Sequence, residues 1–384
     1  MKKLYLLLAI IIASLNLRPI ITSVAPLLGS LQSELGMSGL LASLLTTLPV
    51  FCMGIFAPAA TKLRDRLGLE RTIFFAVLLI TLATAARGII GSAAMLVISA
   101  FVGGVGISLA GPLLSGFIKK YFPTKPSLVS LYSAAMTVGA ALASALSVPI
   151  FEGSGHSFTL ALSCWSLLGV VALIVWAFFL REKGTRGNVV KTRLPLRNKR
   201  ALLLTIFFGL MASMFYTVTA WISPIAHSFG YSKTGSAMML TIFTIVQVPV
   251  SLIIPGLAAK TGRRRFFLIT CSVFELAGVI MLLLHLPMLP AVICLGIGAG
   301  GLFPLALMLP IVETNSSEEA GSWSAMSQCG GYIIGAMGPM LVGVIYDHAG
   351  SFKAALLAML VIVLVMIGVQ TFITDRKPEA QVSS

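Results

Sequence analysis

The feature that most limits how this chain folds is a series of apolar runs, each of membrane-spanning length. A helix needs about 20 predominantly apolar residues to cross roughly 30 Å of hydrocarbon. Runs of this length exclude an outer-membrane barrel, whose strands are about ten residues long and alternate in polarity. We predict an all-α integral membrane protein with twelve transmembrane helices, near residues 4–28, 39–60, 72–90, 93–118, 127–151, 157–180, 201–226, 234–258, 266–286, 288–312, 322–346 and 353–374.

Composition and charge agree with this class. Hydrophobic residues make up 58% of the chain and charged residues 10%, which leaves too little polar surface for a water-soluble globule. The net charge of +15 does not indicate a nucleic-acid partner, because 23 of the 27 Lys and Arg residues fall in alternate segments between the runs. Cytoplasmic loops carry this bias, so we predict a multi-pass inner-membrane protein with both termini in the cytoplasm. The first run continues past Pro19, so we expect a retained span and not a cleaved signal peptide.

The chain divides into two similar halves. Its longest polar stretch follows the sixth run, and we predict an N-terminal six-helix bundle at 1–180, a basic cytoplasmic linker at 181–200 and a C-terminal six-helix bundle at 201–384. The pattern Gly104-x-Gly106 recurs 192 residues later as Gly296-x-Gly298. Parallel repeats of this kind place a substrate site at their interface, near the middle of the bilayer.

An arginine interrupts the first apolar run. Placing Arg18 at bilayer depth costs ~2.5–3.5 kcal/mol on insertion scales, so such a residue faces a wet cavity, a bundle interior or a bound anion. Ser14, Arg18 and Thr22 have the spacing i, i+4, i+8 and share one helix face. Pro19 removes a backbone donor, which frees the carbonyl of Leu15 and predicts a kink. We interpret this stripe as a substrate contact; the alternative is an arginine that pairs with a carboxylate and holds helices together.

Other polar residues in the runs are weaker candidates for solute contact. Hydroxyls and amides also hold membrane helices together, and a tryptophan near a helix end also belongs in an interfacial belt. Arg87 either extends to the headgroups or forms a second anion contact at the mouth. Glu275 either carries a coupling proton or sits neutral in the packing. The further substrate candidates are Tyr216, Thr217, Trp221, Gln247, Gln328 and Tyr332.

The sequence shows no pattern for enzyme chemistry. The five cysteines lie in apolar runs without Cys-x-x-Cys spacing, and the four histidines lie near predicted outer loops. No paired catalytic carboxylates, nucleophile elbow or phosphate loop is evident. We therefore predict no enzyme activity, no metal and no cofactor, with a small solute and the lipid bilayer as partners of a monomer.

The chain resembles the major facilitator superfamily along its whole length. The turn Asp65-Arg66-Leu67-Gly68-Leu69-Glu70-Arg71 is similar to that superfamily's cytoplasmic signature Asp-Arg-x-Gly-x-Arg-Arg, although Glu70 replaces a basic residue. The resemblance implies a cavity lined by spans 1, 4, 7 and 10, and a gating role for this turn, with Asp65 and Arg66 as its charged members beside Gly68 and Arg71.

A narrower resemblance concerns the solute. The stretches 15–28, 44–49 and 298–305, together with Tyr216 and Trp221, are similar to the cyanate and 2-nitroimidazole permease subfamily. It implies a secondary transporter that works by alternating access. Because Arg18 has no acidic residue beside it in the first-half spans, we expect a small planar anion of the cyanate or nitrate type, and not the cation of a multidrug proton antiporter. Transport or export of a neutral nitroimidazole-like or other xenobiotic solute, with or without proton coupling, is the alternative.

The topology is directly testable. A membrane-impermeant thiol reagent added to whole cells should label a cysteine placed at Ser154 or Lys233, and should not label one at Asn188, because only the first two positions lie in predicted outer loops. Labelling of the parent chain is the control for its native cysteines. The reverse pattern would overturn the predicted orientation.

Overall fold

The computed structural model describes residues 2–89, 92–122, 128–181, 195–314 and 317–375 as helices joined by short connections. The N-terminal half contains α1 (Lys2–Asn16), α2 (Pro19–Thr22), η1 (Ala25–Leu27), α3 (Leu28–Leu35), α4 (Gly39–Ile55), α5 (Ala57–Leu67), α6 (Leu69–Ala85), η2 (Ala86–Ile89), α7 (Ala93–Tyr121), α8 (Leu128–Gly153), α9 (Phe158–Ser163), α10 (Ser166–Ala177) and η3 (Phe178–Arg181). The C-terminal half contains α11 (Lys199–Ser228), α12 (Lys233–Thr261), α13 (Arg264–Leu283), α14 (Met288–Val312), α15 (Ser317–Ala349) and α16 (Phe352–Thr371).

The predicted spans are confirmed. Among the described residues, 11 helical segments are long and apolar enough to cross a membrane, and the pair α4 and α5, bent by 53°, supplies a twelfth. Each of these segments overlaps one of the predicted runs. The chain is therefore an all-helical, multi-pass membrane protein.

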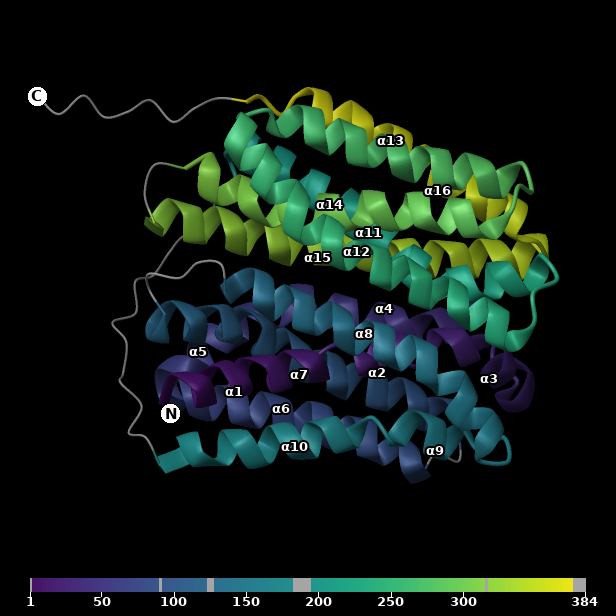
Figure 1. Cartoon of the computed structure of the whole chain (residues 1–384), viewed down its shortest axis with the longest axis horizontal. Helices are drawn as coiled ribbons and strands as arrows, with labels where there is room; N and C mark the ends of the chain where they lie inside the picture. Colours follow the sequence, from purple (N-terminus) through teal and green to yellow (C-terminus); the bar gives the residue numbers. More distant parts are fainter. Residues whose placement is uncertain (1, 90–91, 123–127, 182–194, 315–316, 376–384) are drawn as a thin grey trace, which may run out of the picture.

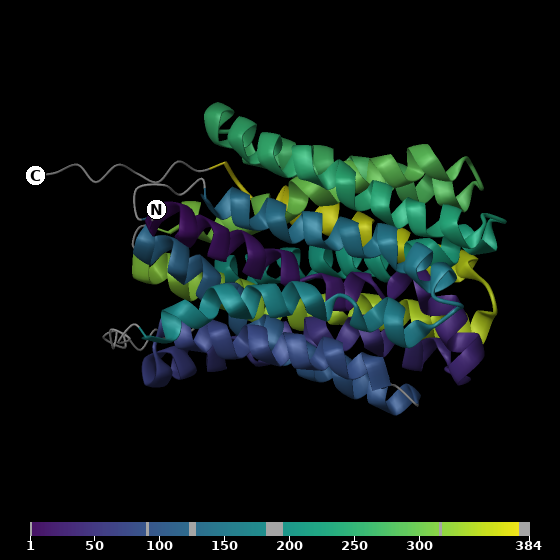
Figure 2. The same ribbon diagram turned by 60° about the horizontal axis from the view of Figure 1, so that its bottom comes forward.

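The two halves lie side by side. Figure 1 shows α1 to α10 grouped together and α11 to α16 grouped next to them, and Figure 2 shows the helices running along the long axis of the molecule. The start of α1 and the end of α16 lie at the same end of the molecule, and α3 and α9 lie at the opposite end (Figure 1).

The repeated glycines occupy equivalent places in the two halves. In α7, a Cβ on Gly104 would lie 2.5 Å from the Cα of Pro49 in α4, and one on Gly106 would lie 2.9 Å from a carbonyl of α6. In α14, a Cβ on Gly296 would lie 3.0 Å from a carbonyl of α12, and one on Gly298 would lie 2.6 Å from a carbonyl of α13. Each pair of glycines thus allows one helix to pack closely on two neighbours, which gives the sequence repeat its physical reason.

Close contacts also join the two halves. α4 packs along α15, where the thiol of Cys329 donates to the carbonyl of Gly54 at 2.7 Å. α8 packs along α12, where the hydroxyls of Ser144 and Thr241 lie 3.1 Å apart. These two seams flank the region between the halves.

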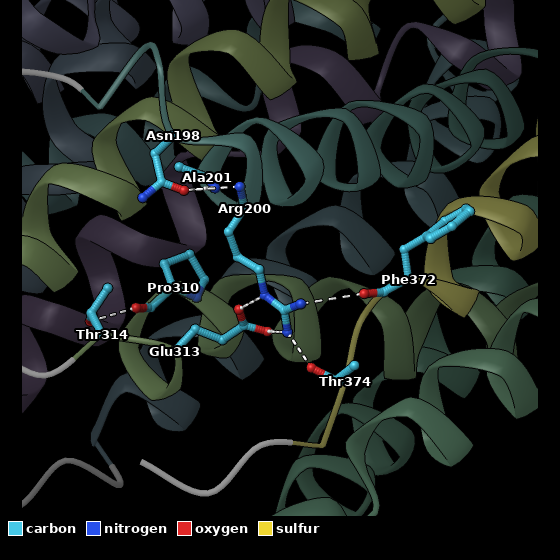
Figure 3. A network of polar contacts seen from close by, with 8 residues as sticks. All are labelled: Asn198, Arg200, Ala201, Pro310, Glu313, Thr314, Phe372 and Thr374. Atoms are coloured by element: carbon cyan, nitrogen blue, oxygen red, sulfur yellow. Dashed lines mark hydrogen bonds and ion pairs between the residues drawn. The ribbon is translucent and has the colours of Figure 1, made fainter. Parts of the chain in front are cut away.

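A partly buried ion pair joins the helix ends of the C-terminal half (Figure 3). Arg200 Nε donates to Glu313 Oε2 at 2.5 Å and its Nη2 donates to Oε1 at 3.1 Å. Nη2 also donates to the hydroxyl of Thr374 at 2.6 Å, so that one guanidinium joins the ends of α11, α14 and α16. The side chain of Asn198 caps α11, which therefore begins at Lys199, inside the predicted linker.

Candidate functional site

The first span is interrupted where Pro19 predicted a kink. α1 ends at Asn16 and α2 begins at Pro19, so that Arg18 lies in the break. On the neighbouring helix α8, Gly139 packs directly against the carbonyl of Leu15, the group that Pro19 leaves without its helical donor. The predicted disruption of the helix at Pro19 is confirmed, and it places Arg18 between the two helical segments, at the N-cap of α2.

Aromatic rings surround the guanidinium of Arg18. Its Cζ lies 5.0 Å from the ring centroid of Phe215, 5.5 Å from that of Tyr216 and 5.8 Å from that of Phe303. The residue is only 6% exposed. Within the part of the chain that the structure describes, the guanidinium has neither a carboxylate nor a hydrogen-bond partner. Ring faces therefore stabilise the charge without using its N–H donors.

A small pocket of about 30 Å³ lies beside Arg18, between the halves. Holding one water takes roughly 10–15 Å³ on this measure, so the pocket has room for a solute of a few atoms. Its wall comes from spans 1, 5, 7, 8 and 10. The lining residues are Arg18, Met136, Thr137, Ala140, Phe215, Thr244, Gln247, Ser251, Ala299, Gly300, Phe303 and Pro304.

The polar lining on α12 donates mainly to its own helix. Gln247 Nε2 donates to the carbonyl of Phe243 at 2.9 Å, and the Thr244 hydroxyl to that of Leu240 at 3.0 Å. The hydroxyl of Ser251 donates to a carbonyl one turn earlier at 2.9 Å. Arg18 is therefore the main source of free donors in the pocket, which favours an acceptor-rich solute.

The rest of the predicted stripe in the first span lies outside the pocket lining. Ser14 donates to the carbonyl of Ile10 at 2.5 Å, and Thr22 donates to that of Arg18 at 3.1 Å. Because the helix breaks between Asn16 and Pro19, the i, i+4, i+8 spacing no longer describes one face. Both hydroxyls instead stabilise the two helical segments on either side of the break.

Two of the aromatic candidates, Tyr216 and Tyr332, lie near Arg18. Tyr216 lies against Arg18 and its hydroxyl donates to the sulfur of Met53 at 3.7 Å, while Tyr332 packs behind it with ring centroids 6.4 Å apart. These two rings support the wall around the guanidinium. Gln328 lies on α15, outside the pocket lining.

Two candidates on α11 face α15 instead of the pocket. Thr217 lies against Gly338, whose Cβ would be 2.5 Å from its hydroxyl oxygen. The indole of Trp221 is buried, donates to the carbonyl of Pro339 at 3.0 Å and packs on Tyr346. Trp221 thus belongs neither to an interfacial belt nor to the pocket wall, because its N–H is used inside the C-terminal half.

Arg87 is fully buried within the N-terminal half, so it does not extend to the headgroups and does not line the pocket. Its Nε donates to the hydroxyl of Ser99 at 3.0 Å, and its Nη1 donates to the carbonyl of Ile20 at 2.8 Å. The carbonyl of Ile20 lacks its helical partner because the N–H of Val24 donates to Ile21 instead. Arg87 therefore stabilises the broken first span that holds Arg18.

Glu275 is 2% exposed and lies on α13. Its side chain packs against Gly298 of α14, and Oε2 has no hydrogen-bond partner within the described residues. The neighbouring residues Ala299 and Gly300 face the pocket. One helix thus separates this carboxyl group from the solute position.

In the signature turn, Glu70 and Arg71 form hydrogen bonds to residues of the N-terminal half. Gly68 ends α5 with φ of +88°, and Arg66 is exposed. Arg71 Nη2 donates to the carbonyl of Leu180 at 3.2 Å. Glu70 accepts from Lys120 at 2.5 Å and from Tyr121 at 2.9 Å. The side chain of Asp65 lies outside the described part of the structure.

Sequence reasoning missed most of the apolar wall. Phe215 precedes the predicted Tyr216, and Phe303 lies inside the stretch 298–305 that carries the resemblance. Neither ring stands out by type in a chain with 22 phenylalanines. Only the folded position beside Arg18 separates these two from the others.

Two helical halves that enclose a charged pocket within the membrane define a solute transporter. The chain belongs to the Major Facilitator Superfamily, whose family model matches residues 6–336 and 201–384. This superfamily consists of transporters, so the protein is not an enzyme.

Three relatives match nearly the whole chain. The sequence is 32% identical to the cyanate transport protein CynX of Escherichia coli, over 90% of this chain and 91% of that protein. It is 29% identical to the 2-nitroimidazole transporter of the same organism, over 95% and 94%. It is also 32% identical to the uncharacterized transporter YycB of Bacillus subtilis, over 94% and 91%.

Solved structures show the same fold. A mutant of the nucleoside transporter NupG superimposes with a TM-score of 0.77 at 13% identity, over 95% of this chain and 99% of that chain. At this identity the likeness concerns the fold alone.

The buried position of Arg87 generates a stability prediction. Arg87→Gln should lower the free energy of unfolding by about 2 kcal/mol, because the Ile20 carbonyl and the Ser99 hydroxyl lose a charged donor. Thermal unfolding in detergent measures the loss, and Arg71→Gln, which removes an exposed arginine that donates to the carbonyl of Leu180, is the matched control. Equal melting temperatures for both variants would contradict the role of Arg87.

Proposed function

We propose that this protein moves a small planar anion of the cyanate or nitrate type across the inner membrane by alternating access, with Arg18 as the anion contact. The observation that carries the proposal is a guanidinium in a pocket between the halves, held by three aromatic rings and without a carboxylate partner among the described residues. An uncompensated charge at this depth favours a counter-charge supplied by the solute.

The size and chemistry of the pocket support this class of solute. A volume of about 30 Å³ suits an ion of a few atoms better than a substituted ring. Arg18 can present two parallel N–H donors to one small anion. The similarity to a cyanate transport protein points in the same direction.

A neutral nitroimidazole-like solute is the second candidate. The faces of Phe215, Tyr216 and Phe303 suit stacking on a planar heteroaromatic ring, and one relative is a 2-nitroimidazole transporter. This candidate requires the pocket to widen. Glu275, which packs on the pocket helix α14, is then the residue we propose for proton coupling.

Substitutions of Arg18 distinguish the two solutes. For an anion, Arg18→Lys should lower transport roughly tenfold, since lysine keeps the charge but loses the planar fork, and Arg18→Gln should lower it on the order of a hundredfold. Transport of a neutral solute should fall less in Arg18→Gln, because glutamine keeps part of the hydrogen-bond donor capacity of arginine. Counterflow in proteoliposomes with cyanate, nitrate, bicarbonate, small carboxylates and 2-nitroimidazole measures both ratios.

Normal insertion of each variant, checked beside Arg71→Gln, is the control for these measurements. If Arg18→Gln inserts normally and transports its best solute like the wild type, Arg18 is structural and the proposed site is wrong.

The signature turn supports a separate proposal about gating. We expect Asp65→Asn to lower the turnover rate more than the apparent solute affinity, because the family resemblance assigns Asp65 to a cytoplasmic gate with Arg66, Gly68 and Arg71, and not to the site. The maximal rate and the half-saturating concentration of solute uptake, measured together, test this. Unchanged kinetics in a normally inserted variant would remove the assignment.

A further inference from the structure

The carboxylate of Asp347, near the end of α15, binds the start of α4 in the other half of the chain. Its Oδ1 accepts from the backbone N–H of Gly39 at 2.6 Å, and its Oδ2 accepts from that of Leu40 at 2.8 Å. Both oxygens of one carboxylate are thus used across the boundary between the two halves. We call this pair of bonds the Asp347 clamp.

The clamp completes the cap of α4. The first N–H groups of a helix have no partner inside it and carry the positive end of the helix dipole. In α4, the N–H of Leu41 donates to the hydroxyl of Ser38 at 3.1 Å and that of Ala42 to the carbonyl of Ser38 at 2.9 Å. The two remaining groups rely on Asp347. Bonds from an ionised carboxylate to such donors are stronger than neutral ones.

Two glycines allow the helices to meet at this point. A Cβ on Gly343 would lie 2.7 Å from the carbonyl oxygen of Gly39, and a Cβ on Gly39 would lie 3.0 Å from that of Gly343. A larger residue at either position would push α15 away from α4. The clamp therefore depends on close backbone approach as well as on charge.

The clamp lies at the end of the molecule that is opposite to both chain ends, where α3 leads into α4. Next to it, Tyr346 lines a second cavity of about 390 Å³ between the halves. This cavity is bounded by Gly29 and Ser33 from the first span and by Ser223 from α11. Under the predicted topology this is the outer vestibule.

We propose that the Asp347 clamp sets the equilibrium between the outward-closed and outward-open forms of the transporter. When the halves separate at this end, the carboxylate and both N–H groups form hydrogen bonds to water instead of to each other. The polar groups are therefore satisfied in both forms, and the contact can switch between two states. Asp347 is a positioning residue that does not touch the solute. The inference depends on the transporter class and not on the identity of the solute.

The test measures access to the central pocket from outside. Ala140 lines the pocket and is replaced by cysteine as a reporter, and an impermeant thiol reagent is added to whole cells. Labelling at position 140 is quantified by peptide mass spectrometry. Asp347→Asn keeps the side-chain shape but loses the charge and one acceptor, so the labelling rate should rise roughly tenfold.

Asp375→Asn is the matched control. Asp375 Oδ1 accepts from the backbone N–H of Arg265 at 2.9 Å, at the start of α13 and within one half. Removing this cap should leave labelling at position 140 at the wild-type rate. A general loss of stability from losing a helix cap would raise labelling in both variants alike, and that result would overturn the proposal.

Further variants of the same contact keep the test decisive. Gly343→Ala keeps the carboxylate of Asp347 but separates the helices, and it should also raise labelling at position 140. Asp347→Glu keeps the charge on a longer side chain, and it should raise labelling less than Asp347→Asn does. If the labelling rate rises only in Gly343→Ala, close packing of α4 and α15 controls access, and the proposed role of the carboxylate is wrong. Wild-type labelling in both Asp347 variants would overturn it as well.

Discussion

The structure depends on holding the positive charge of Arg18, which has no carboxylate partner among the described residues, between two groups of apolar helices. Arg18 is stabilised by the faces of Phe215, Tyr216 and Phe303, which come from the other half of the chain. Rings attract a guanidinium without occupying its N–H groups, whereas a carboxylate would both neutralise it and take up its donors. The surroundings of this charge are therefore complete only when both halves are in place.

The break in the first span is the second requirement. Pro19 ends α1 and places Arg18 in a short non-helical step, where backbone carbonyls would be left without donors in lipid. Arg87 satisfies the carbonyl of Ile20, and Gly139 allows α8 to cover the break. A second buried arginine thus supports the position of the first, and it lies outside the pocket lining.

The seams between the halves have to close tightly and still come apart. Glycines on α4 and α15 provide close contact at both ends of this helix pair, with Gly54 at one end and Gly343 at the other. Among the described residues, Asp347 supplies a charged contact across the boundary. Small residues and a few strong directional bonds suit an interface with two discrete arrangements better than a continuous apolar core does.

The sequence by itself determined the spans, the repeat and the helix break at Pro19, and it singled out Arg18 as a candidate, because hydrophobic length, glycine spacing and a charge in an apolar run are local properties. It did not determine where the side chains of Trp221 and Arg87 point, since a buried donor binds whichever carbonyl the tertiary structure leaves free. It also gave no reason to select Phe303 among many similar rings. Only the tertiary structure decided these positions, because residues distant in sequence become neighbours only when the helices pack.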